Sequence, residues 1–243
     1  MHSFPRFSLL FLAAILFSTM SAKATVTWTQ VDYPGASETE VRGINNNGDA
    51  VGSYRDSSGV HGFLLSNGVF TTIDYPRAYS TEAESINDAG VIAGTYAMFL
   101  SPFEPTGFIY QDGVMTTFRF PGRTYTWIHG INNAGDFVGE SQGSRGGTRG
   151  YLHRSDGTLT HIIAKGAYGT LVNGINNSGD IVGYYFSAHH ARGFVFRDGI
   201  WQLIDFPKSG GRNCTRSMTT NSLREKWSLN LCPGASHAST TRS

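Results

Sequence analysis

A ten-residue block recurs four times along this chain, and the repetition constrains the fold more than any other feature. The block begins at Gly43, Ser85, Gly130 and Gly174, and its third residue is always asparagine. These asparagines fall at positions 45, 87, 132 and 176, so they lie 42, 45 and 44 residues apart. Repeats of this length are typical of solenoids and propellers, in which each repeat is one supersecondary unit packed on its neighbours.

Two further blocks follow in the same order. A glycine and an aromatic residue come first, at 62–63, 107–108, 150–151 and 193–194, and each pair leads into an Asn-Gly or Asp-Gly dipeptide at 67–68, 112–113, 156–157 or 198–199. A segment ending in proline closes three repeats, at 73–76, 118–121 and 204–207, whereas the third repeat has 162–165 without proline. An extra copy, 31–34, precedes the first repeat.

The turn chemistry of these blocks predicts four strands in each repeat. Asn-Gly and Asp-Gly between apolar runs favour type I′ hairpins, which need a positive φ at both central residues. The Asn-Asn-x-Gly segments also suit tight turns, with asparagine side chains bonded to nearby backbone. Strand a then ends at Ile-Asn, strand b carries the Val-Gly pair, strand c is the glycine–aromatic block and strand d ends at proline.

The predicted fold is therefore all-β, a β-propeller built from four-stranded antiparallel blades. It has four complete repeats and an orphan N-terminal strand at 27–33, which would complete the last blade. A fifth, closing blade from 208–243 is one interpretation of the C-terminal segment. An off-pattern basic tail is the other, since Asn221 has the right spacing but lacks the surrounding isoleucine and glycines.

The order of the three blocks resembles the bacterial "probable extracellular repeat, HAF family". The segment His61-Gly62-Phe63 is similar to its name-giving His-Ala-Phe motif, with glycine in place of alanine. The resemblance covers about residues 26–207. It implies an extracytoplasmic, propeller-like protein and implies no catalytic residues.

The N-terminus independently predicts secretion. Residues 1–24 resemble a signal peptide: His2 and Arg6 precede an apolar run at 8–20, and Ala22 and Ala24 suit signal peptidase. Residues 25–207 form the predicted repeat domain and 208–243 the closing blade or tail. No later apolar run is long enough to span a membrane, so we expect no membrane span after signal removal.

The charge distribution and the cysteines limit the classes of partner and cofactor that this chain is expected to bind. Residues 25–207 hold eleven Lys and Arg against seventeen Asp and Glu, which disfavours binding of nucleic acid. Residues 208–243 hold six Lys and Arg against one Glu. The only cysteines, Cys214 and Cys232, lie in this basic segment and could pair in an oxidising compartment. Their spacing matches no zinc or redox motif, and no cofactor or metal is predicted.

The strand order places the b–c and d–a connections at one end of the repeats, and binding residues are expected there. The interval between the glycines that bound each b–c loop varies: 52–62, 94–107, 139–150 and 183–193. Each d–a link instead repeats a threonine, at 39, 81, 126 and 170, which we expect to bond nearby backbone. The candidate binding residues at this end are Tyr79, Tyr125, Trp127, Arg145, Arg149, Tyr168, His189 and His190.

Each candidate also has a structural interpretation. The aromatic residues could form a stacking platform for sugars or pack between blades. The glycine-rich stretch 143–150 suggests a phosphate cradle but lacks the following helix, and His189-His190 lacks a carboxylate partner for a metal. Asn-Asn-x-Gly-Asp could bind calcium, but no distal glutamate recurs, which favours the turn.

The tandem scaffold and the variable loops at one end predict a secreted, non-catalytic binding or interaction module. The sequence contains no catalytic motif, although an active site with dispersed residues would have none. The expected partner of this module is an extracellular glycan or protein, and a monomer is expected. The alternative is a propeller-type carbohydrate hydrolase or lyase, which would require converging Asp, Glu and Tyr side chains.

Overall fold

The computed structural model describes residues 27–100, 102–144, 146–187 and 191–204. The chain divides into two compact units, Met1–Gln30 and Val31–Ser243, and all the strands belong to the second. Residues 27–30, the described part of the first unit, are exposed and have no regular secondary structure. The described residues contain strands and no helix, which confirms the all-β prediction. They include no helix able to cross a membrane.

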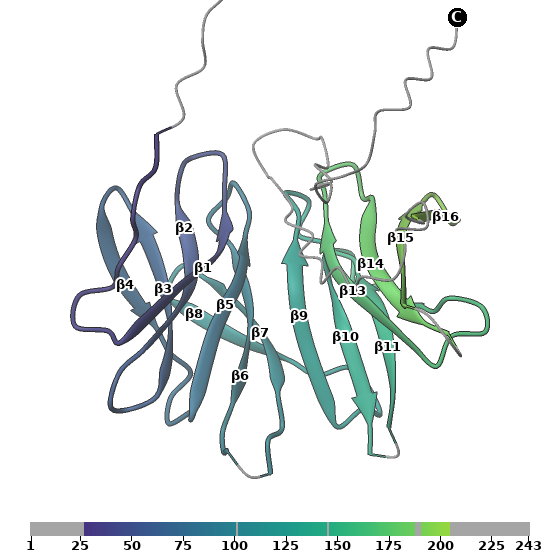
Figure 1. The fold of residues 1–243 in the computed structure, drawn as a ribbon, viewed down its shortest axis with the longest axis horizontal. Coiled ribbons are helices and arrows are strands. Elements are labelled where there is room, and N and C mark those ends of the chain that lie inside the picture. The colour runs from purple at the N-terminus through teal and green to yellow at the C-terminus, as the bar shows by residue number, and fades with distance from the viewer. Residues whose placement is uncertain (1–26, 101, 145, 188–190, 205–243) are drawn as a thin grey trace, which may run out of the picture. The chain divides into compact units, whose positions relative to one another are not determined.

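Sixteen strands follow one another in four groups of four (Figure 1). The first repeat contains β1 (Glu38–Ile44), β2 (Ala50–Arg55), β3 (Val60–Ser66) and β4 (Val69–Ile73), and the second β5 (Ser80–Ile86), β6 (Ile92–Ala97), β7 (Thr106–Gln111) and β8 (Val114–Phe118). The third contains β9 (Tyr125–Ile131), β10 (Phe137–Gly143), β11 (Gly146–His153) and β12 (Leu159–Ile162), and the fourth β13 (Gly169–Ile175), β14 (Ile181–Phe186), β15 (Ala191–Arg197) and β16 (Ile200–Ile204).

Each repeat is an antiparallel meander in which strands a, b, c and d pair in chain order. This confirms the four predicted four-stranded groups. Between repeats the structure adds one pairing that the blocks did not indicate, a parallel contact of Val60 in β3 with Ser80 in β5.

The hydrophobic core is divided into three clusters, each built from two consecutive repeats. Val51 of the first repeat packs with Ile86 and Ile92 of the second. Ala93 of the second packs with Ile128 of the third, and Val138 of the third packs with Val172 of the fourth. Each repeat therefore buries its apolar face only against a neighbour, which explains why the pattern must recur.

The glycine of strand b is required by the close approach of strands a and c. A Cβ at Gly94 would lie 2.2 Å from the carbonyl oxygen of Glu82 and 2.6 Å from the ring of Phe108. The aromatic residue of strand c therefore fills the space above this glycine. The four equivalent rings, Phe63, Phe108, Tyr151 and Phe194, are fully buried.

The repeated threonine holds each d–a link as predicted. Its hydroxyl oxygen accepts a hydrogen bond from the backbone N–H six residues earlier, at 3.0 Å for Thr126 and Phe120 and 3.1 Å for Thr81 and Tyr75. The same bond joins Tyr33 to Thr39 and Ala164 to Thr170. These links thus have one conformation because the hydroxyl replaces a missing backbone partner.

The a–b turns confirm the structural interpretation of Asn-Asn-x-Gly. In the third repeat, the Asn132 side-chain oxygen accepts hydrogen bonds from the N–H groups of Ala134 (3.0 Å) and Asp136 (2.9 Å). Asn132 is 3% exposed. Its backbone carbonyl accepts a hydrogen bond from the Gly135 N–H, which closes the turn. The asparagine side chain thus supplies the acceptors that this tight turn lacks.

The same asparagines also connect the repeats, which the sequence did not indicate. The side-chain amide of Asn45 donates to the carbonyl of Asn87 at 3.1 Å, Asn87 donates to Asn132 at 3.1 Å, and Asn132 donates to Asn176 at 3.3 Å. We call these four residues the asparagine ladder. Beside it, the N–H groups of Asn46, Asp88 and Asn133 each bond to a side chain of the next repeat.

Two predicted strand positions are wrong. Residues 27–33 form no strand, and the neighbour expected for them, 208–243, lies outside the described residues. Tyr33 nevertheless stacks on Tyr54 at 3.6 Å, as Tyr75 does on Tyr96 at 3.7 Å. Strand d also ends before its proline, at Ile73 and Phe118 in the first two repeats, so the proline lies in the d–a link.

One of the predicted hairpin turns has a different conformation. Asn67, Asp112 and Asp198 have the positive φ that type I′ turns need, with values of 49°, 50° and 49°. In the third repeat only Gly157 has a positive φ, and Asp156 instead accepts a hydrogen bond from the Thr158 N–H at 2.8 Å. The side-chain oxygen of Asp156 thus stabilises a longer turn.

The predictions for the chain termini and cysteines fall outside the described residues. These are the signal peptide at 1–24, the segment 208–243, and Cys214 with Cys232.

Candidate functional site

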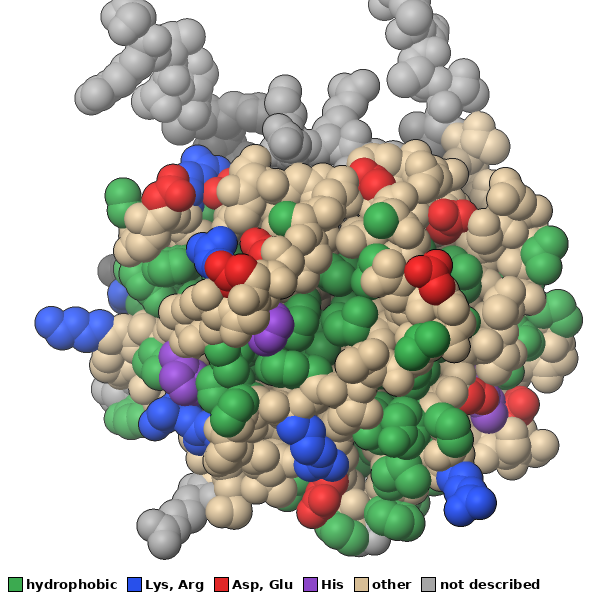
Figure 2. Space-filling model, turned by 180° about the vertical axis from the view of Figure 1, so that it is seen from behind, with side chains coloured by type: hydrophobic (Ala, Val, Ile, Leu, Met, Phe, Trp, Pro, Cys, Tyr) green, Lys and Arg blue, Asp and Glu red, His purple; other side chains and the backbone are tan. Residues whose placement is uncertain are grey.

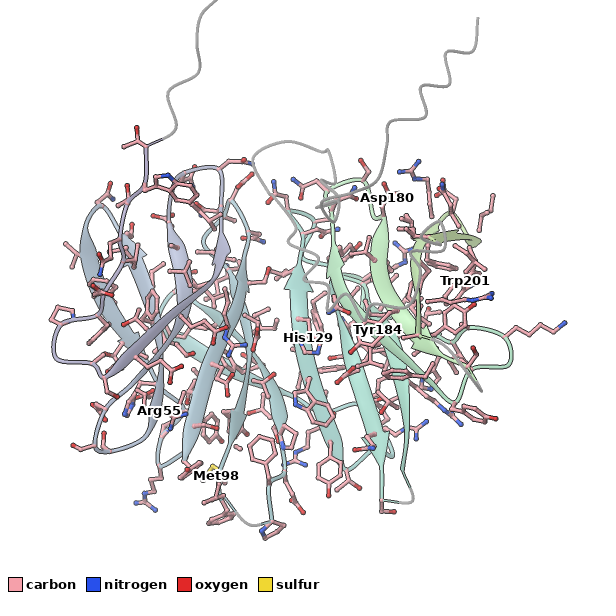
Figure 3. All side chains as sticks on the ribbon, viewed as in Figure 1. Arg55, Met98, His129, Asp180, Tyr184 and Trp201 are labelled. Carbon is pink, nitrogen blue, oxygen red and sulfur yellow. The ribbon has the colours of Figure 1, made fainter. Side chains whose placement is uncertain are left out.

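The two ends of the strands carry different kinds of connection (Figure 3). The a–b and c–d turns, including that of Asp180, lie at one end, and the b–c loops and d–a links, near Arg55 and Met98, lie at the other. This confirms the predicted distribution of loops. Several large apolar side chains are exposed on the b–c loop that follows β6: Phe99, Leu100 and Phe103, at 62%, 64% and 46%. Hydrophobic side chains also reach the surface toward this end in Figure 2.

The candidate residues are only partly brought together. Tyr79 and Tyr168 occupy equivalent positions in two d–a links and are 39% and 73% exposed, so they do not pack between repeats. Arg149 is exposed on β11. Arg145, His189 and His190 lie outside the described residues.

Tyr125 and Trp127 form the one ring pair among the four candidate aromatic residues that the structure describes. Both lie on β9 and are partly exposed, with ring centroids 6.1 Å apart. Neither belongs to the three buried clusters. Trp127 directly faces Glu140 across the β9–β10 pair.

A β-bulge in strand a places a polar residue at the same point of every repeat. The register with strand b shifts between Val41 and Gly43, between Ala83 and Ser85, and at the equivalent points of the third and fourth repeats. The extra residues are Arg42, Glu84, His129 and Asn173, which we call the bulge row. Bulges commonly redirect a side chain at functional sites.

Arg42 connects the first two repeats through carboxylates. Its guanidinium nitrogens lie 2.9 Å from Glu40, 3.0 Å from Glu82 and 3.0 Å from Glu84. Burial lowers the pKa of Arg42, but the three carboxylates outweigh burial and leave it raised. Burial raises the pKa of Glu84, although Arg42 and then His129 act against it.

Glu140 lies next to the bulge row, in a surrounding poor in hydrogen-bond donors. One oxygen, Oε1, is 3.9 Å from Nε2 of His129, and the other, Oε2, is buried without a hydrogen-bond partner. Its side chain is 14% exposed. Burial raises the pKa of Tyr184, and the charge of Glu140 raises it further. His129 and Tyr184 lie at the middle of their strands in Figure 3.

We call Trp127, His129, Glu140 and Tyr184 the Glu140 site. It combines an aromatic ring, an imidazole, a phenol and a carboxylate with an unused acceptor. Such a surface can stack on a ring face and accept hydrogen bonds from hydroxyl or amino groups.

A second cluster at the loop end places a serine beside a histidine. Oδ2 of Asp74 is 2.8 Å from Nδ1 of His61, and Nε2 of His61 is 2.9 Å from the Ser58 hydroxyl. This geometry is that of a nucleophile with its base. The hydroxyl of Ser58, however, donates to Asp56 at 2.6 Å, and Asp56 also accepts the N–H groups of Ser58 and Gly59.

The pKa shifts in this cluster follow from its hydrogen bonds and charges. Hydrogen bonds from Ser58 hold the pKa of Asp56 at about 2. Burial lowers the pKa of His61, but Asp74 and Asp56 outweigh burial and raise it, which favours the imidazolium. Because the Ser58 hydroxyl donates its hydrogen to Asp56, it can act only as an acceptor toward His61. The cluster instead ties the b–c loop to the d–a link of the first repeat.

The aspartates of the a–b turns have structural partners. Asp180 pairs with Arg197, Asp136 accepts the Ser155 N–H at 2.9 Å, and Asp49 accepts the Asn45 amide at 3.0 Å. Among the described residues no group of three or more His, Cys, Asp or Glu side chains is arranged to hold a metal ion.

Comparison with known proteins identifies no family. No family model matches this chain, and no curated protein matches it. Among solved structures it is similar to a crystal structure of a triple arginine-to-alanine variant of AofleA from Arthrobotrys oligospora, with 13% sequence identity and a TM-score of 0.44. The match covers 69% of this chain and 56% of that protein.

Sequence reasoning identified Tyr125 and Trp127 but missed His129, Glu140 and Tyr184. One signal was available: Arg42, Glu84, His129 and Asn173 each precede the residue that opens the ten-residue block. This repeat position is polar in a segment that is otherwise nearly constant.

Proposed function

We propose that this chain is a secreted, β-propeller-like, non-catalytic module that binds an extracellular glycan through the Glu140 site. The meander of four strands in each repeat and the burial of each repeat against the next support a propeller-like arrangement. The signal-like N-terminus and the resemblance to an extracellular repeat family support secretion.

The observation that carries the proposal is the position of Trp127 opposite Glu140. Their direct pairing across β9 and β10 places both side chains on one face of the sheet. An indole ring stacks on the C–H face of a sugar, while a carboxylate accepts hydrogen bonds from its hydroxyls. These are the two interactions that a neutral polyol offers.

A glycan array followed by calorimetry on the best ligand tests this proposal. Replacing Trp127 with alanine removes the stacking ring, and we expect an affinity loss of about tenfold or more. Trp28→Ala is the matched control, since Trp28 is 90% exposed and lies outside the repeats. Unchanged affinity of the folded Trp127→Ala variant, or a wild type that binds no glycan, contradicts the proposal.

One observation favours the alternative function, a carbohydrate hydrolase or lyase. Titratable groups that affect one another's charge gather here, as acid–base catalysis requires. His129 acts on the pKa of Glu84 and lies 3.9 Å from Glu140, and Glu140 acts on the pKa of Tyr184. Burial keeps the pKa of Glu84 raised, as in a general acid. Release of reducing or unsaturated sugar ends by wild type, and its loss in Glu84→Gln, would replace binding by turnover as the function.

A further inference from the structure

The charge around the Glu140 site carries an inference about the ligand that rests on the proposed glycan binding. Glu40, Glu82, Glu84 and Glu140 stand on the strands that carry this site and the bulge row, and Arg42 is the cation paired with three of them. With His129 neutral the formal charge of this group is −3, and with His129 protonated it is −2. A neutral sugar gains nothing from this charge, whereas a cationic sugar is attracted by it.

Glu140 is the carboxylate of this group that lacks a close cation. Arg42 already satisfies Glu84 with two contacts, at 3.0 and 3.2 Å, and it also contacts Glu40 and Glu82. Glu140 has only the distant His129 at 3.9 Å, and its Oε2 has no partner. A carboxylate without a close cation gains a charge-assisted hydrogen bond when an ammonium group approaches its exposed part.

Aromatic side chains around this carboxylate suit a cation equally well. Trp127 faces Glu140 in the β9–β10 register, and Tyr184 is near enough for the carboxylate to raise the pKa of its phenol. A cation over an indole or phenol ring is attracted by the electrons of the ring. The same indole can stack on the sugar ring that bears the ammonium group. A lysine side chain carries an ammonium group but has no ring for this stacking.

We propose that the Glu140 site recognises an amino sugar with a free ammonium group, as in an N-deacetylated glucosamine polymer. The ammonium donates to the carboxylate of Glu140, and the sugar ring stacks on Trp127. An N-acetylated sugar lacks the charge and is bound more weakly.

Calorimetry with paired oligomers tests this assignment in mildly acidic buffer, where the amines are charged. Wild-type protein should bind glucosamine oligomers about tenfold or more tightly than N-acetylglucosamine oligomers of the same length, and added salt should reduce the difference. Glu140→Gln keeps the shape and removes the charge, so it should abolish the preference. Glu38→Gln is the matched control, because Glu38 is 68% exposed and contacts Arg55 at 3.4 Å.

The outcomes separate the two proposals. Equal affinity for both oligomers, or an unchanged preference in a Glu140→Gln variant with a wild-type thermal unfolding curve, overturns the amino-sugar assignment and leaves glycan binding standing. If the protein binds another glycan of the array but neither oligomer, the amino-sugar assignment is likewise overturned and glycan binding stands. Oligolysine bound as tightly as oligoglucosamine overturns the sugar assignment as well. Binding of no glycan overturns both proposals.

Discussion

The two ends of the repeats differ in how their connections are held. At the a–b end, buried asparagines make the same hydrogen bonds within each turn. Their side-chain amides also donate to the equivalent asparagine of the next repeat. At the other end, the b–c loops differ in length and expose Phe99 and Leu100. One repeat thus provides uniform turns and d–a links that fix the scaffold, and b–c loops that are free to change. The Glu140 site lies between them, on strands fixed by the first.

The largest expected effect is at the asparagine ladder. Asn132→Ala removes two bonds within its turn and one to Asn176, and it leaves buried N–H groups without acceptors. We expect a loss of about 3 kcal/mol in the free energy of unfolding, measured with urea. Asn176→Ala should cost about 1 kcal/mol, since Asn176 is partly exposed. Equal losses for the two variants would show that the ladder does not couple the repeats.

A smaller effect is expected at the threonine that holds each d–a link. Thr126→Val keeps the shape of the side chain but removes the acceptor for the Phe120 N–H in a site that is 1% exposed. We expect a loss of about 1–2 kcal/mol in thermal or urea unfolding. Thr126→Ser should retain most of the stability, and failure of serine to do so would assign the effect to the methyl group.

The His61 cluster predicts a pH dependence at the variable end. The pKa of His61 is raised by Asp74 and Asp56, so its contribution to stability is full below the unfolded pKa and is lost as pH rises through the folded pKa. The stability difference between wild type and His61→Gln should therefore be larger at mildly acidic pH than at mildly alkaline pH. Urea unfolding at the two values checks this, and a difference that grows with pH would contradict it.

The smallest effect on stability is expected at exposed side chains of the b–c loops and d–a links. Phe99→Ser replaces a side chain that is 62% exposed and should change the free energy of unfolding by at most about 0.5 kcal/mol. Tyr168→Ser, at 73% exposure, should behave alike. A loss approaching that of Thr126→Val would show that these exposed side chains also support the scaffold.

Features set by local chemistry could be predicted from the sequence. The turn at Asn132, the bond of Thr126 and three of the four c–d hairpins depend on residues within a few positions of each other. The turn at Asp156 was predicted wrongly, because its Asp-Gly dipeptide is the same as in other repeats while the loop around it is longer. The strand expected at 27–33 depended on a distant partner and was wrong.

Only part of the Glu140 site could be predicted from the sequence, because the site depends on contacts between different strands. Trp127 was identified by its residue type, but Glu140 comes from the next strand and faces it only through the β9–β10 register. The bulge at His129 reverses the alternation of side chains along strand a, so a regular pattern could not place it. The asparagine ladder likewise joins residues about 44 positions apart.

The most direct test of this account is an NMR titration of the wild-type protein with its best array glycan. We expect the largest shifts at the indole N–H of Trp127 and the amides of His129 and Glu140, with the side-chain amides of Asn45, Asn87 and Asn132 unchanged. Shifts that concentrate on the asparagine ladder and spare Trp127 would contradict the division between a structural end and a binding surface.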